Sequence, residues 1–115
     1  MVRIEVVKEA GRIVAMTLDG HAETEDSYDN IVCASVSILA QTCVLGLAHV
    51  AGITELEYGI DDGHLSFRLP VRLTARQQEE ARIITETLMI GMYGTQEMHP
   101  QYIEIVEREV RSDAF

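Results

Sequence analysis

One uncharged stretch limits what this chain can fold into: residues 31–54 contain no Asp, Glu, Lys or Arg. A run of this length could cross a membrane as a helix. It contains serine, glutamine, threonine and histidine, however, and its flanks are acidic, whereas spanning helices are typically flanked on the cytoplasmic side by Lys and Arg. We therefore interpret it as a helix buried in a protein core, and we expect no membrane partner.

The residues inside this run predict where the helix begins and ends. Asn30 precedes it and is a residue type that caps helices. Gly52 is expected to end it, because glycine readily adopts the left-handed conformation that follows many helices. Few exposed positions are strongly polar, so we expect the helix to lie between layers or in a subunit interface. The apolar residues at helical spacing are Val32, Val36, Leu39, Cys43, Leu47 and Val50.

Two hairpins are predicted, one on each side of this helix. Residues 2–8 and 13–18 alternate apolar and polar side chains around a short turn that contains Gly11. Residues 55–60 and 65–69 repeat the alternation around the turn sequence Asp-Asp-Gly. Paired hairpins favour an antiparallel or mixed sheet.

A second helix and a last strand complete the predicted order. Thr74 and Gln77 have the spacing of a capping box, and an amphipathic helix is expected to run from there to about Gly94. Residues 102–107 predict a final strand. The order is ββαββαβ, which indicates an α+β fold with two helices packed on a mostly antiparallel or mixed sheet. With 115 residues, we expect one domain over residues 1–115.

Charge narrows the possible partners. The formal net charge is −10, and no stripe of Lys and Arg is present to neutralise phosphates, so we expect no direct contact with nucleic acid. A basic protein segment is the partner that this charge favours.

The two cysteines, Cys33 and Cys43, differ in their surroundings. On one helix they would lie about 15 Å apart, whereas a disulfide needs Cα atoms within about 7 Å. We therefore expect two thiols in a reducing compartment. Cysteines in apolar runs are usually small buried hydrophobes, and this is our interpretation of Cys43, which lies on the apolar stripe.

Cys33 has a second interpretation, because it follows the expected cap Asn30 closely. Unpaired amides and the helix dipole at that end would stabilise a thiolate, and the same amides could hold an oxyanion. His21, which follows Gly20, could act as the acid/base partner of such a thiolate. The polar residues 22–29 between them could cover the site. His49, His64 and His99 show no metal-ligand spacing, and we expect neither metal nor cofactor.

Three segments resemble a known family. Gly20-His21-Ala22, then Asn30-Ile31-Val32-Cys33-Ala34-Ser35-Val36-Ser37 after a short loop, is similar to the signature of the ribosomal-processing cysteine proteases of the Prp family. Pro100-Gln101-Tyr102-Ile103-Glu104-Ile105 resembles their last strand. The chain differs at Asn30, where the family usually has aspartate. Asparagine caps a helix about as well, and Asp29 could supply the missing carboxylate.

The resemblance implies a cytoplasmic, homodimeric cysteine endopeptidase that removes an N-terminal segment from a basic ribosomal protein of the large subunit. It implies Cys33 as nucleophile and His21 as general acid/base. The supporting or substrate-binding residues would be Gly20, Asp29, Asn30, Ala34 and Ser37. Two alternatives remain: a non-catalytic, ribosome-associated binding module on the same fold, and a thiol redox protein. The second lacks a resolving cysteine within reach of Cys33.

Overall fold

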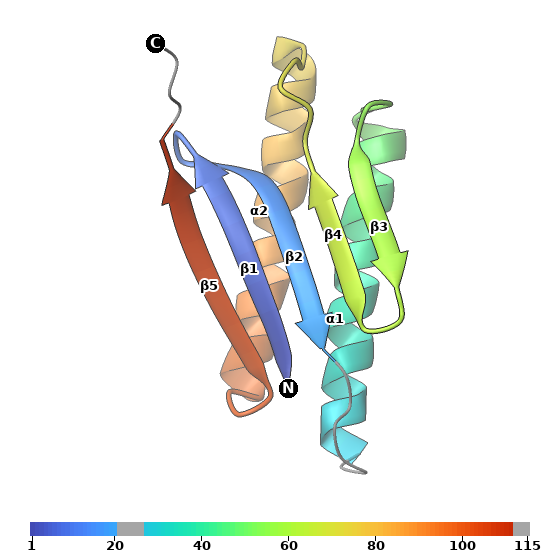
Figure 1. The fold of residues 1–115 in the computed structure, drawn as a ribbon, viewed down its shortest axis with the longest axis vertical. Helices are drawn as coiled ribbons and strands as arrows, with labels where there is room; N and C mark the ends of the chain where they lie inside the picture. The colour runs from blue at the N-terminus through green and yellow to red at the C-terminus, as the bar shows by residue number, and fades with distance from the viewer. Residues whose placement is uncertain (21–26, 112–115) are drawn as a thin grey trace.

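A five-stranded sheet is covered on one face by two long helices in the computed structural model (Figure 1), which describes residues 1–20 and 27–111. The observed order ββαββαβ confirms the predicted α+β fold. The elements are β1 (Val2–Glu9), β2 (Arg12–Gly20), α1 (Ser27–Leu45), the short π-helix η1 (Gly46–Val50), β3 (Glu57–Asp61), β4 (His64–Arg68), α2 (Ala75–Met98) and β5 (Ile103–Val110).

The sheet is mixed, with the strand order β3-β4-β2-β1-β5. β5 pairs in parallel with β1, and the other neighbours pair antiparallel. The predicted alternation decides which face is buried. Ile4 lies opposite Leu18, and Leu18 lies opposite Leu65; all three are buried in the core. Their neighbours along each strand are more polar and point to the open face.

Both hairpins turn where the sequence predicts. Ala10 and Gly11 connect β1 to β2, both with positive φ (52° and 77°), which suits the twist of a tight hairpin. Gly63, with φ of 75°, follows Asp62 between β3 and β4. Glycine adopts this conformation without steric cost, whereas Ala10 adopts it at some cost.

Helix α1 continues into η1 and then ends at Gly52, whose φ of 66° confirms the predicted stop. By length and composition, the segment Asn30–Val50 is apolar enough to cross a membrane. Val32, Val36 and Leu47 nevertheless pack in the core beneath the sheet. This buried stripe supports the interpretation as a core helix, although only 33% of the apolar window is buried inside the structure.

Helix α2 begins with the predicted capping box. The Gln77 amide donates to Thr74 Oγ1 (3.1 Å), and the Thr74 amide donates to Gln77 Oε1 (3.0 Å). The predicted end near Gly94 is wrong, since the helix runs on to Met98. Gly94 has no positive φ, so it continues the helix, and the added turn lies toward β5.

The two helices approach each other closely at two glycines. A Cβ on Gly91 would lie 3.4 Å from Leu39 Cδ1, and one on Gly46 would lie 3.5 Å from Ile84 Cγ2. These are van der Waals distances, so the small residues set the spacing of the helical layer. One flank of α1 therefore faces α2, and the opposite flank is turned away from it.

Candidate active site

The end of β2 leads into the candidate site, and its last residue must be glycine for a steric reason. A Cβ on Gly20 would lie 2.9 Å from Val2 Cγ2 and 3.1 Å from the Met1 carbonyl oxygen. The φ of Gly20 is not in the left-handed region. The glycine is therefore needed for its close contact with β1 and not for a left-handed backbone conformation.

Two contacts fix the β3–β4 turn against this strand end. The Gly20 amide donates to the Gly63 carbonyl (2.9 Å). The imidazole Nδ1 of His64 lies 2.5 Å from Asp19 Oδ1. No sequence pattern indicates this pair, because 45 residues separate Asp19 from His64 and only the sheet register brings them opposite each other.

The first turns of α1, which contain Cys33, begin at the same end of the molecule as the end of β2 (Figure 1). The helix begins at Ser27, so Asn30 is not its N-cap and Cys33 belongs to the second turn. The unpaired amides of a helix are confined to its first residues, and the dipole effect falls off within the first turn. The prediction that Cys33 lies among free amides is therefore wrong, although its Cβ still tilts toward that end.

Four predicted site residues share one side of α1, because spacings of three and four residues bring side chains together on a helix. Asn30 and Ala34 are exposed, and Cys33 and Ser37 are half-buried. Leu39 points to the other flank, where it contacts Gly91 of α2. The Cys33 side of α1 is thus the flank turned away from α2, and Cys33 also packs against the hydrophobic core.

Two predicted site residues cannot be placed. His21 lies outside the described residues. Asp29 belongs to α1, but its side chain is not described. Their roles, and the pairing of His21 with Cys33, remain predictions.

Cys43 differs from Cys33 in the way that the sequence predicts. It is buried in the core, and desolvation raises the pKa of its thiol to about 12. A thiol of this kind is unreactive near neutral pH. Neither cysteine forms a disulfide. Within residues 1–20 and 27–111, no three His, Cys, Asp or Glu side chains converge as metal ligands.

Comparison with known proteins decides the family. Residues 1–104 match the family model described as cysteine protease Prp. The chain belongs to the Prp family. The ribosomal processing cysteine protease Prp of Staphylococcus aureus is 22% identical over 109 residues, which cover 91% of this chain and 97% of that protein. Membership makes this chain a cysteine protease and disfavours both the non-catalytic binding module and the redox protein.

Solved structures share the fold. SMU.848 from Streptococcus mutans superimposes with a TM-score of 0.79 at 23% identity, covering 96% of each chain. Prp from S. aureus in complex with a substrate peptide gives a TM-score of 0.76 at 21% identity, covering 94% of this chain and all of that one. A second S. aureus Prp structure carries a covalently linked product peptide.

Proposed function

We propose that this Prp-family protease is an endopeptidase that removes the N-terminal segment of a basic ribosomal protein, with Cys33 as nucleophile and His21 as general acid/base. The family match carries this proposal. The S. aureus relative is named as a ribosomal processing enzyme. Cys33 suits the role better than Cys43, because it is half-buried on α1 whereas Cys43 is buried in the core.

The proposed reaction proceeds in two steps. His21 accepts the Cys33 proton, and the thiolate attacks the scissile carbonyl carbon. The C–N bond breaks as the imidazolium protonates the leaving amine, and a thioester remains on Cys33. Water, deprotonated by His21, then attacks the thioester, which releases the peptide carboxylate and restores the thiol.

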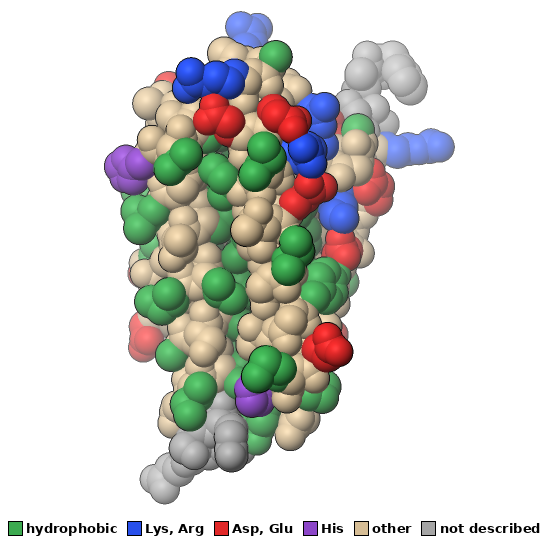
Figure 2. All heavy atoms as spheres, turned by 180° about the vertical axis from the view of Figure 1, so that it is seen from behind, with side chains coloured by type: hydrophobic (Ala, Val, Ile, Leu, Met, Phe, Trp, Pro, Cys, Tyr) green, Lys and Arg blue, Asp and Glu red, His purple; other side chains and the backbone are tan. Residues whose placement is uncertain are grey.

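The charge distribution supports a basic substrate. All Lys and Arg residues except Arg3 lie toward the end opposite Cys33, and Figure 2 shows those on the helical face gathered there. The Cys33 end carries carboxylates, and four more acidic residues precede Cys33 in the sequence after Gly20. Such a field would concentrate a cationic segment near Cys33. The described carboxylates at this end are Asp19, Asp61, Asp62, Glu97 and Glu104.

We also propose that the enzyme is a cytoplasmic homodimer that associates through its helical face. On α1, Ile31, Ile38 and Leu45 recur every seven residues and are 56%, 63% and 56% exposed. On α2, Ile83 and Ile90 are 51% and 77% exposed. Figure 2 shows hydrophobic side chains spread down this face. Exposed apolar patches of this kind mark interaction sites. The thiols fit a reducing compartment.

Mass spectrometry of the host's precursor ribosomal protein tests the reaction. We expect wild-type enzyme to shorten its N-terminus, Cys33→Ala to leave it intact, and Cys43→Ala to retain cleavage. Cleavage by Cys33→Ala would refute the assignment. For the dimer, Ile38→Glu with Ile90→Glu should give a monomer in analytical ultracentrifugation. Val71→Glu, at a fully exposed position in the segment between β4 and α2, should not.

A further inference from the structure

A groove of about 570 Å³ lies at the end of the molecule opposite Cys33. The β1–β2 turn, the chain that follows β4 and the first turns of α2 form its walls. Its lining is largely aliphatic and includes Ile13, Leu69, Pro70 and Leu73. The Leu69 amide donates to the Val14 carbonyl (2.8 Å), so the segment after β4 is held against β2. The volume lies within the range of ligand sites.

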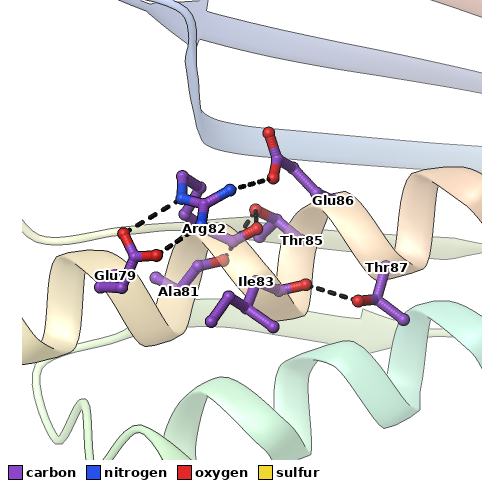
Figure 3. Close-up of polar contacts among 7 residues, drawn as sticks. All are labelled: Glu79, Ala81, Arg82, Ile83, Thr85, Glu86 and Thr87. Atoms are coloured by element: carbon purple, nitrogen blue, oxygen red, sulfur yellow. Dashed lines mark hydrogen bonds and ion pairs between the residues drawn. The ribbon is translucent and has the colours of Figure 1, made fainter.

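Arginines surround this groove in a chain that is otherwise strongly acidic. Arg12, Arg68 and Arg82 line it, and Glu9 is the one carboxylate among its described lining residues. Arg82 is already paired with Glu79 and Glu86 on its own helix (Figure 3), so its guanidinium is occupied.

Two of the three guanidiniums are not paired with acid. Arg12 donates to the amide oxygen of Gln78 (2.6 Å). Within the described part of the chain, no carboxylate lies within 4.0 Å of the guanidinium of Arg12 or Arg68. The pKa of the Glu79 carboxyl is lowered mainly by its hydrogen bond from Arg82 and to a smaller extent by the charge of Arg12. Both cations therefore retain donors at the edge of an aliphatic surface, although Glu57 lies opposite Arg68 on the neighbouring strand β3.

We propose that this groove binds an acidic peptide segment of a partner protein, in which carboxylate side chains alternate with aliphatic ones. Guanidinium groups bind carboxylates through two parallel hydrogen bonds, and the aliphatic lining accepts the neighbouring side chains. Among the described residues that line the groove, none is aromatic, so they offer no platform for stacking nucleobases. Because the groove lies far from Cys33, the proposal does not depend on the proposed proteolytic reaction.

Fluorescence anisotropy with a fluorescein-labelled peptide of six alternating glutamate and leucine residues tests the proposal. The binding protein is the Cys33→Ala variant, so that the peptide is not cleaved during the measurement. We expect saturable binding that Arg68→Gln and Arg12→Gln each weaken about tenfold, the size of one lost charge-assisted hydrogen bond. Arg3→Gln removes an equal charge at the other end of the molecule and should leave binding unchanged.

Val71 provides a second pair of variants that do not disturb packing. It lines the groove and is fully exposed. Val71→Asp should weaken binding, and Val71→Lys should tighten it. Equal binding of a matched glutamine–leucine peptide, or an equal effect of Arg3→Gln, would overturn the proposal. Displacement of the peptide by oligouridylate at lower concentration would also overturn it, in favour of an RNA site.

Discussion

Replacing Gly20 with alanine should destabilise the fold at the strand end that leads to His21. The added Cβ would lie 2.9 Å from Val2 Cγ2, 3.0 Å from Val2 Cα and 3.1 Å from the Met1 carbonyl. Two of these three atoms belong to backbone, so β1 must shift. Overpacking of this kind costs about 1–3 kcal/mol. The lower entropy of the unfolded alanine chain offsets about 0.4–1 kcal/mol, and a net loss of stability remains.

Urea denaturation followed by circular dichroism measures this loss. Gly94→Ala is the matched control, because a Cβ there meets no atom of the described residues within 4 Å and the residue lies inside α2. Alanine is the better helix former, so this variant should gain about 0.5–1 kcal/mol. We expect the two unfolding midpoints to move in opposite directions. If Gly20→Ala unfolds at the wild-type midpoint or above it, the steric argument is refuted.

Three further changes test other parts of the fold. Thr74→Ala removes the cap of α2 and should cost about 1 kcal/mol in urea denaturation, whereas Thr74→Ser should restore most of it. Thr85 is buried, and its hydroxyl donates to the Ala81 carbonyl (2.8 Å). Thr85→Val should change the free energy of unfolding by less than about 1 kcal/mol, because the substitution removes the donor together with its hydrogen bond and leaves no unpaired hydroxyl in the core. The hydrogen bond from Lys8 lowers the pKa of the Glu107 carboxyl. This interaction therefore stabilises the fold fully above the usual glutamate pKa, and the stabilisation is lost as the pH falls through the lowered pKa of Glu107. Glu107→Gln should therefore flatten the loss of stability as the pH falls below the usual glutamate pKa, measured as the urea midpoint.

Local patterns predict the elements of this fold well because each has a local cause. Alternating residues give the strands, Thr74 and Gln77 begin α2, and Gly52 ends the first helical segment. The start of α1 is harder to predict, since Ser27, Asp29 and Asn30 are all residue types that cap helices. The sequence does not decide among them, and the choice of Asn30 is wrong.

Features that depend on contacts between distant residues could not be predicted from the sequence, for a different reason. The parallel pairing of β5 with β1 depends on the path of α2 across the sheet, and no local residue encodes a strand's direction. The contact between Asp19 and His64 likewise requires that β2 and β4 be neighbours. The steric need for Gly20 becomes visible only when Val2 is placed opposite it.

The position of Cys33 changes which group is expected to activate it. In the second turn of α1, the helix dipole and free amides contribute little to a thiolate, so an imidazolium must contribute most of the stabilisation. We therefore expect His21→Gln to slow alkylation of Cys33 by iodoacetamide near neutral pH at least tenfold, measured by mass spectrometry. Cys43, with its raised pKa, is the internal reference and should react slowly in both proteins. An unchanged Cys33 rate in His21→Gln would show that the helix, and not His21, activates the thiol.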